Sequence, residues 1–169
     1  MNSTDSSADF VLTRVFDAPR ELVFRTMTEG AHLQKWWGPK GCTIDVLEHT
    51  LHVGGAFHYA MRFGAVVAVY GKFTYREITP VERIIFTNGF ADAEGNRVHY
   101  QAIPTWPLEV LNTITLTEAD GKTSMTLHSA PFNAGEVEVA TFKAGHASMT
   151  EGFGGMYDVY ADYLATLTA

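Results

Sequence analysis

The stretch 146–167, HASMTEGFGGMYDVYADYLATL, decides the fold. Its apolar side chains recur every three or four residues, at Met149, Phe153, Met156, Tyr157, Tyr160, Leu164 and Leu167. This spacing places them in one stripe along an amphipathic helix. Gly152, Gly154 and Gly155 each weaken such a helix by roughly 1 kcal/mol relative to alanine. The helix therefore needs a large surface under its apolar stripe, and we expect the rest of the chain to supply it.

The length and net charge of the chain limit the classes of protein to which it can belong. A chain of 169 residues suits one domain with a core of its own. The net charge of -7 argues against a nucleic-acid partner or an anionic membrane, because either would require a basic face. No apolar run is long enough to span a membrane. We therefore expect neither a nucleic-acid partner nor a membrane.

The N-terminus and the cysteine content predict a cytoplasmic protein. Residues 1–7 are polar and lack the basic and apolar regions of a signal peptide. Cys42 is the only cysteine, so nothing points to an oxidising compartment. We predict a disordered tail over residues 1–8 and a single domain over 9–169.

Before the long helix, the chain predicts one strand, two short helices and about six further strands. A β-prone run covers 10–16, and helical spacing follows over 20–27 and around Leu33 and Trp36. Alternation and turn signals then predict strands over 42–51, 56–63, 66–78, 83–90, 108–116 and 123–129. The stretch 91–107 reads as irregular, and a helical segment begins within 136–142.

This order predicts an α+β fold. There is no alternation of strands and helices, so a parallel doubly wound sheet is not expected. Strands linked by hairpins form a curved antiparallel sheet of six to seven strands instead. The long C-terminal helix is the element left to cover the concave face, with a space between helix and sheet.

Several motifs give the sequence a family resemblance. They are Trp36-Trp37-Gly38-Pro39, Val53-Gly54-Gly55-Ala56-Phe57, Gly71-Lys72-Phe73, Ile78-Thr79-Pro80-Val81-Glu82-Arg83-Ile84, Thr105-Trp106-Pro107-Leu108-Glu109-Val110, Gly121-Lys122-Thr123 and Gly152-Phe153. Together they resemble the START-like superfamily, also called the helix-grip or birch-pollen-allergen fold. The most similar branch contains homologues of the C-terminal domain of the heat-shock-protein-90 ATPase activator.

The resemblance implies a helix-grip fold and leaves the activity open, because members include ligand binders and a few enzymes. One departure concerns Phe153, where relatives usually carry tryptophan. The smaller ring is expected to reshape the cavity and to set this protein's specificity. The activator also has a separate chaperone-binding domain that has no counterpart here, so a chaperone-activating role is not expected.

A ligand cavity is predicted between the sheet and the long helix. Its expected lining residues are Trp37, Phe57, Tyr59, Met61, Phe73, Tyr75, Phe86, Phe153, Met156, Tyr157 and Tyr160. Taken singly, each also fits ordinary core packing, and Trp37 also fits a structural anchor, a gate or a dimer contact. An empty apolar void of about 300 Å³ would cost roughly 7 kcal/mol, so a cavity of that size implies a ligand, water or a function.

Candidates for chemistry are few. His99 and His128 could act as general bases near the cavity, because histidine titrates near neutral pH. Glu151 is the one carboxylate beside the inward stripe of the long helix. His58 alternates with Phe57 and is therefore expected on the surface. No metal-binding spacing occurs, and neither a metal nor a cofactor is expected.

Three functions remain open at this point. The first is binding of a small hydrophobic or aromatic ligand without catalysis. The second is an enzyme of the cyclase, dehydratase or hydrolase type that acts on such a ligand. The third is a protein-interaction module, co-chaperone-like or a homodimer. An enzyme needs at least two titratable groups in reach of one reacting atom, and few inward candidates exist, which favours binding.

Overall fold

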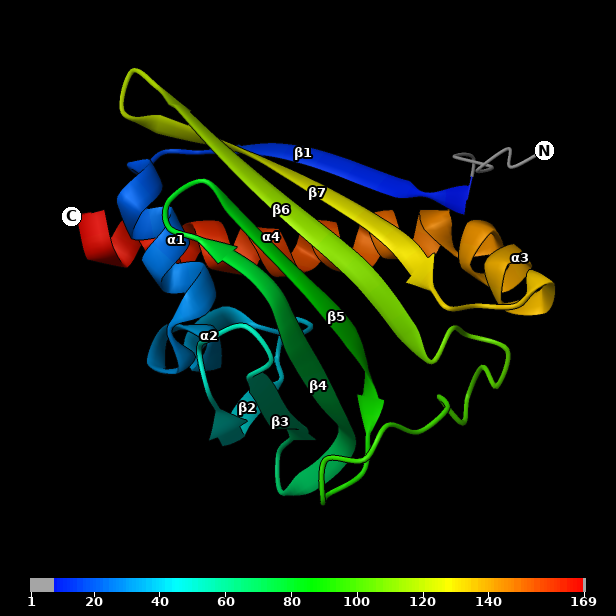
Figure 1. Ribbon diagram of the computed structural model, residues 1–169. Helices are drawn as coiled ribbons and strands as arrows, with labels where there is room; N and C mark the ends of the chain where they lie inside the picture. Colours follow the sequence, from blue (N-terminus) through cyan, green and yellow to red (C-terminus); the bar gives the residue numbers. More distant parts are fainter. Residues whose placement is uncertain (1–7, 169) are drawn as a thin grey trace.

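The computed structural model describes residues 8–168, and Figure 1 shows how their elements are arranged. Strand β1 (Phe10–Phe16) comes first, followed by two short helices, α1 (Arg20–Thr28) and α2 (Gly30–Trp36). Six strands follow: β2 (Thr43–His49), β3 (Ala56–Phe63), β4 (Val66–Thr79), β5 (Arg83–Ala91), β6 (Glu109–Ala119) and β7 (Lys122–Phe132). Helices α3 (Glu136–Ala144) and α4 (His146–Thr168) complete the described chain.

The strands form one antiparallel sheet in the order β1-β7-β6-β5-β4-β3-β2. Strand β1 pairs with β7, the last strand, so both edges of the sheet come from the first half of the chain. Register shifts interrupt the β2–β3, β3–β4 and β4–β5 pairings. Such bulges bend strands and increase their twist, and the sheet curves around α4 (Figure 1). The predicted α+β helix-grip architecture is confirmed.

Helix α4 lies against the concave face of the sheet, behind the strands in Figure 1. Its second half is firmly packed, and Tyr160 is fully buried there. The ring centroid of Tyr160 lies 4.3 Å from that of Trp36 on α2 and 4.9 Å from that of Phe16 on β1. Its hydroxyl also shares a 2.7 Å hydrogen bond with that of Thr26 on α1. This end of the molecule is a filled aromatic core.

The predicted N-terminal tail falls almost entirely outside the described residues, which begin at Ala8. Ala8 itself is buried, and its carbonyl oxygen pairs at 2.8 Å with Nε2 of His146, at the start of α4. The first described residue is therefore held against the long helix.

The position of His58 corrects one expectation from the sequence. Alternation with Phe57 places it on the outer face of β3, which predicts exposure, yet His58 is only 5% exposed. The loop between β5 and β6 folds back over this face, and the carbonyl oxygen of Asp92 lies 2.9 Å from Nε2 of His58. The expected surface position was wrong because a segment distant in sequence covers it.

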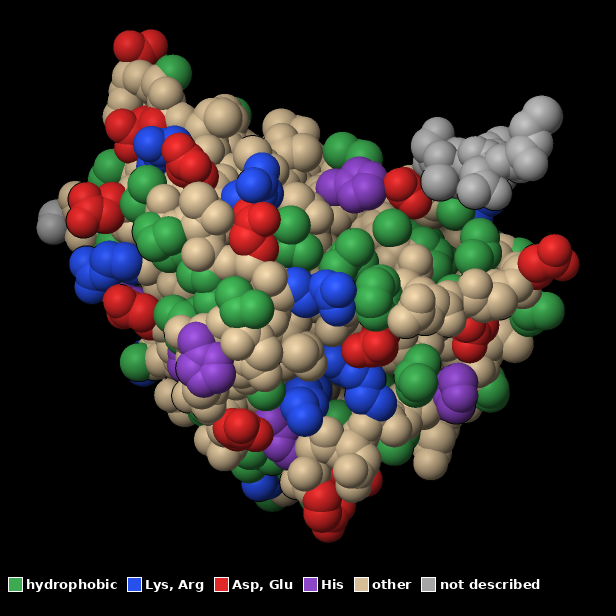
Figure 2. All heavy atoms as spheres, in the orientation of Figure 1, with side chains coloured by type: hydrophobic (Ala, Val, Ile, Leu, Met, Phe, Trp, Pro, Cys, Tyr) green, Lys and Arg blue, Asp and Glu red, His purple; other side chains and the backbone are tan. Residues whose placement is uncertain are grey.

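The outer face of the sheet carries mixed charges. Figure 2 views this face, and Lys and Arg side chains alternate there with Asp and Glu rather than forming one basic area. Among the described residues, no helix combines the length and apolar character that crossing a membrane requires.

Candidate functional site

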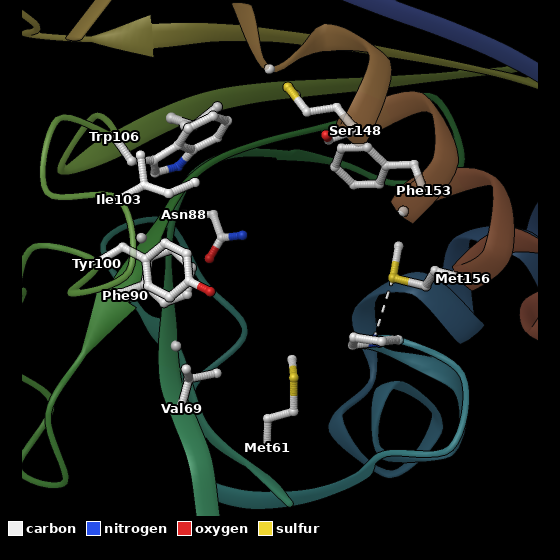
Figure 3. Close-up of a pocket in the computed structure, with 18 of the residues that line it drawn as sticks. Met61, Val69, Asn88, Phe90, Tyr100, Ile103, Trp106, Ser148, Phe153 and Met156 are labelled. Carbon is white, nitrogen blue, oxygen red and sulfur yellow. Dashed lines mark hydrogen bonds between the residues drawn. The ribbon is translucent and has the colours of Figure 1, made fainter. Parts of the chain in front are cut away.

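A cavity of about 620 Å³ lies between the sheet and the first half of α4 (Figure 3). Its walls come from β3, β4, β5 and β6 on the sheet side, and from α3 and α4 on the helix side. The Trp37–Pro39 turn and the β5–β6 loop contribute the remaining walls. This volume is within the range of pockets that hold drug-sized molecules, about 300–1,000 Å³.

The lining is mostly apolar and aromatic. It consists of Trp37, Gly38, Pro39, Tyr59, Met61, Val69, Tyr70, Gly71, Asn88, Gly89, Phe90, Tyr100, Ile103, Trp106, Val110, Asn112, Thr141, Ala144, Gly145, Ser148, Met149, Gly152, Phe153 and Met156. Among these described lining residues there is no Asp, Glu, Lys, Arg, His or Cys. The cavity therefore offers a ligand dispersion contacts and a few neutral hydrogen-bonding groups.

Trp37 separates the cavity from the filled aromatic core. Its ring packs edge-on to Phe73, with centroids 4.9 Å apart, and lies 6.4 Å from the ring of Tyr59. Phe73 in turn stacks on Phe86 at 4.3 Å. The aromatic side chains of the sheet thus fill the space on one side of Trp37, and the cavity occupies the other.

Tyr59 forms the part of the wall that crosses from β3 to β4. Its ring covers Gly71, which is its partner across the two strands. A Cβ on Gly71 would lie 2.3 Å from the Tyr59 hydroxyl oxygen, so only glycine permits this approach. Burial raises the pKa of Tyr59 to about 12, against a smaller lowering by the neighbouring Trp37 side chain. Tyr59 is therefore a protonated, neutral phenol at physiological pH.

The turn after α2 is fixed to the long helix. The Gly38 amide N–H donates to Sδ of Met156 over 3.3 Å, which Figure 3 marks with a dashed line. Met156 is buried on α4 and also lines the cavity. The contact holds Trp37 and Pro39 at the rim, so the Trp-Trp-Gly-Pro motif shapes this side of the cavity.

The β5–β6 loop closes the opposite side. Tyr100 stacks on Phe90 of β5, with ring centroids 4.2 Å apart and planes 9° from parallel. Trp106 packs against Phe142 of α3 at 5.4 Å, and Ile103 lies between the two aromatic contacts in Figure 3. Strand β5 and helix α3 thus hold the loop at its two aromatic residues.

Arg97 anchors the same loop to the outer face of the sheet. Its guanidinium pairs with Glu109 at 2.6 Å and donates to the Lys72 carbonyl oxygen at 2.9 Å. It also donates to the hydroxyls of Thr74 and Thr87, at 2.9 and 3.3 Å. Charged hydrogen bonds of this kind are among the stronger ones in proteins. The β5–β6 loop is therefore held to the outer face of the sheet by Arg97, while its later residues reach the cavity on the inner face.

Two asparagines bring polarity into the cavity. Asn112 on β6 is buried, and both ends of its amide are hydrogen-bonded: Ser129 donates to its Oδ1 at 2.6 Å, and its Nδ2 donates to the Val110 carbonyl oxygen at 3.2 Å. Asn88 on β5 differs, because its Oδ1 is buried without a hydrogen-bond partner in the described structure. Figure 3 shows the Asn88 side chain pointing into the open space.

Five of the eleven predicted ligand-binding residues line the cavity: Trp37, Tyr59, Met61, Phe153 and Met156. The other six, Phe57, Phe73, Tyr75, Phe86, Tyr157 and Tyr160, are buried in the filled core. The six point inward as expected, but they pack against other core side chains and not against the cavity, four from the sheet and two from α4. Ligand contact by the five remains a prediction.

Phe153 lies at the wall where the relatives' tryptophan is expected. Its ring stacks between Phe10 of β1, at 5.8 Å, and Tyr157, at 6.1 Å. One edge of the side chain faces the cavity in Figure 3. Its influence on specificity remains a prediction that this position supports.

The weak catalytic candidates lie outside the cavity lining. His99 and Glu151 are exposed, and His128 points to the outer face of β7, where its Nε2 is 3.0 Å from a carboxylate oxygen of Asp9. Within residues 8–168, no group of three or more His, Cys, Asp or Glu side chains is arranged to hold a metal ion.

Sequence reasoning missed both asparagines and the aromatic residues of the loop. The signal for Asn88 was the alternation on β5, where Ile84 and Phe86 face inward and residue 88 continues their row. Asn112 interrupts the inward row of β6 between Val110 and Ile114 in the same way. Tyr100, Ile103 and Trp106 have no periodic pattern that could have placed them.

Solved structures share this fold. A protein from Mycobacterium smegmatis superposes with a TM-score of 0.76 at 21% identity, covering 96% of this chain and 94% of that one. A protein from Arthrobacter aurescens gives 0.75 at 24% identity, covering 93% and 86%. The AHSA1 protein from Silicibacter pomeroyi gives 0.70 at 21% identity, covering 94% and 98%. A comparison with curated proteins gives no match.

The sequence itself matches a family profile. The profile describes the "Activator of Hsp90 ATPase homolog 1-like protein" and aligns with residues 17–165, nearly the whole chain. The match includes both the Trp-Trp-Gly-Pro turn and the long helix, which together bound the cavity. The fold of this family is compatible with ligand binding. The chain therefore belongs to the Activator of Hsp90 ATPase homolog 1-like family.

Proposed function

We propose that the protein binds a small, largely hydrophobic or aromatic molecule in the cavity under α4, without catalysing a reaction on it. One observation carries the proposal: a cavity of about 620 Å³ with an apolar, aromatic lining that contains no charged side chain among the described residues. Pockets of this size and character bury most of a drug-sized ligand.

The lining also explains why binding is favoured over catalysis. General acid–base chemistry needs positioned groups that exchange protons near the working pH. The ionisable lining residues of the described chain are tyrosines, and burial raises the pKa of Tyr59 to about 12. A phenol of that pKa donates a hydrogen bond at neutral pH but does not act as a base. These features support a binding protein.

The walls support a binding site that exists before the ligand arrives. The Gly38–Met156 contact fixes one rim, and the Arg97 anchor with the Phe90–Tyr100 stack fixes the other. A preformed site binds more tightly because less conformational entropy is lost on binding. The site is therefore suited to rigid, ring-containing molecules.

A fluorescent probe tests the proposal directly. N-phenyl-1-naphthylamine is neutral and aromatic, and its emission rises in apolar surroundings. We expect saturable binding with one site per chain, accompanied by quenching of Trp37 or Trp106, which both line the cavity.

The decisive comparison uses two leucine substitutions on α4. Gly152 lines the cavity, and a Cβ there would meet no atom within 4 Å, so Gly152→Leu fills space without a clash at its Cβ. We expect at least about tenfold weaker probe binding, a loss of about 1.4 kcal/mol. Gly154→Leu is the matched control, because Gly154 has equal space at its Cβ but does not line the cavity.

Two results would contradict the proposal. The first is a wild-type protein that binds none of N-phenyl-1-naphthylamine, 1-aminoanthracene and 2-naphthol. The second is equal loss of probe binding in both leucine variants, which would place the probe elsewhere. A cytoplasmic location and a homodimer, both predicted from the sequence, are separate proposals that fractionation and sedimentation would test.

A further inference from the structure

We propose that the ligand carries an uncharged hydrogen-bonding group, a hydroxyl or a carboxamide, and that the Asn88 amide receives it. This inference rests on the proposed function and narrows it, because it names the polar chemistry of an otherwise apolar ligand. Its basis is the one polar side chain of the described cavity lining that has a buried atom without a partner.

Asn88 is placed at the sheet wall of the cavity by its strand. It follows Ile84 and Phe86 in the inward row of β5, and its neighbours across the sheet are Phe73 on β4 and Val110 on β6. All four of these residues are apolar and buried. A polar amide in such surroundings loses its hydration unless another group replaces the water.

The Asn88 amide is free to meet a ligand. Its Oδ1 is buried without a partner, and the described structure records no hydrogen bond of its Nδ2. Figure 3 shows the amide between the loop residues on one side and open space on the other. Buried polar groups are nearly always hydrogen-bonded in native proteins. Rotation of the amide about its Cβ–Cγ bond exchanges the positions of Oδ1 and Nδ2, so a ligand group in the cavity would supply the missing partner once Oδ1 is turned toward it.

Asn112 shows what a purely structural asparagine looks like in the same wall. It lies on the adjacent strand and faces the same cavity, yet Ser129 and the Val110 carbonyl oxygen engage both ends of its amide. The fold therefore satisfies one of the two inward amides and leaves the other unpaired. Because of this contrast, packing alone does not explain an asparagine at position 88.

The complementary group is neutral and can both donate and accept. An amide offers one accepting oxygen and one donating nitrogen, and a hydroxyl or a second carboxamide matches both. A carboxylate or an ammonium group would enter the cavity without a counter-ion, because no charged side chain lines it in the described chain. Arg97 faces the outer side of the sheet and is already paired with Glu109.

A double-mutant cycle tests the pairing with two probes of matched size. 2-Naphthol and 2-methylnaphthalene differ by a hydroxyl in place of a methyl group, and Asn88→Leu replaces the amide with an apolar side chain of similar shape. We expect the preference for 2-naphthol over 2-methylnaphthalene to be about tenfold greater in the wild type than in Asn88→Leu. Calorimetric titration of both proteins with both probes provides the four dissociation constants.

A second probe pair tests the exclusion of charge and needs no variant. 2-Naphthamide and 2-naphthoate have similar shapes, but only the second is charged at pH 7. We expect the wild type to bind the amide at least about tenfold more tightly, because the carboxylate would lose its hydration without a counter-charge. This comparison keeps the inference testable if Asn88→Leu does not fold.

The outcomes separate this inference from the proposed function. If the naphthalene probes bind but the cycle gives less than a twofold effect, Asn88 does not receive the polar group and the inference is overturned while the binding function stands. Equal or tighter binding of 2-naphthoate also overturns it. If none of the probes binds the wild type, the proposed function fails as well.

Discussion

At the scale of single residues, Gly38 meets two demands at one position. Its φ angle is +98°, in the region that favours glycine, and its amide N–H holds Met156. A Cβ at Gly38 would also lie 2.7 Å from Sγ of Cys42 and 3.3 Å from Cε of Met61. The turn at the rim of the cavity therefore depends on the absence of a side chain.

The first prediction compares two alanine variants in this turn. Gly41 also has a positive φ, +91°, but a Cβ there would meet nothing within 4 Å. Gly41→Ala should lower the unfolding free energy by about 1–2 kcal/mol, which is the cost of holding a residue with a Cβ at a positive φ. Gly38→Ala should lose more, because Cys42 must also move, and it alone should weaken probe binding. Urea unfolding and probe titration measure both effects, and equal losses in both variants would argue against the clash.

At the scale of elements, the three glycines of α4 have a different role from that of Gly38. Two reasons could account for Gly152, Gly154 and Gly155 in a helix that they weaken: close packing against a neighbouring element, or space for a ligand. Close packing is wrong, because a Cβ at any of the three would meet no atom within 4 Å. Only Gly152 lines the cavity, so space for a ligand is a sufficient reason at that position alone.

The second prediction follows for the other two positions. Gly154→Ala and Gly155→Ala should each raise the unfolding free energy by about 1 kcal/mol, because alanine is the better helix former and both sites have room. Probe affinity should stay within about twofold of the wild type, since neither residue lines the cavity. Chemical denaturation checks the first point and fluorescence titration the second. A destabilised Gly154→Ala would instead point to the Arg14 side chain, which donates to the Gly154 carbonyl oxygen at 3.1 Å.

Regular elements were accessible from the sequence, and the β5–β6 loop was not. Alternation and helical spacing gave β1 and β3 with their observed bounds and started α4 at His146. These patterns reflect burial on one face, which local sequence records. The loop instead depends on contacts with distant partners, such as Arg97 with Lys72 and Trp106 with Phe142. No local pattern encodes such contacts, so the sequence did not predict that this loop lines the cavity.

At the scale of the whole molecule, the space under α4 is divided into a filled part and a hollow part. Inward-facing aromatic residues on the sheet were predicted correctly, but alternation cannot say which of them meet a helix and which meet a cavity. Phe73 and Phe86 stack in the filled part, whereas Tyr59 borders the hollow part, although all three belong to similar strand patterns. The division depends on where α1, α2 and Trp37 pack, which only the assembled fold determines.

The filled part and the cavity wall contain buried tyrosines whose ionisation is coupled to unfolding. Burial raises the pKa of Tyr75, Tyr157 and Tyr160 well above the ordinary 10.0, and that of Tyr59 to about 12. The unfolded chain loses these phenolic protons near pH 10, whereas the folded chain retains them. Their contribution to stability is therefore complete below pH 10 and falls as the pH rises toward 12 and beyond.

The third prediction is an alkaline unfolding transition in which tyrosine ionisation and loss of structure coincide. Absorbance of the phenolate near 295 nm should rise in the same pH interval in which the far-ultraviolet circular dichroism is lost. Tyr157→Phe removes one of these ionisable groups, and the described structure records no hydrogen bond of the Tyr157 hydroxyl, so packing is kept. That variant should unfold at higher pH than the wild type. Ionisation of all the tyrosines while the circular dichroism stays native would show that solvent reaches the aromatic core, contrary to the filled packing described here.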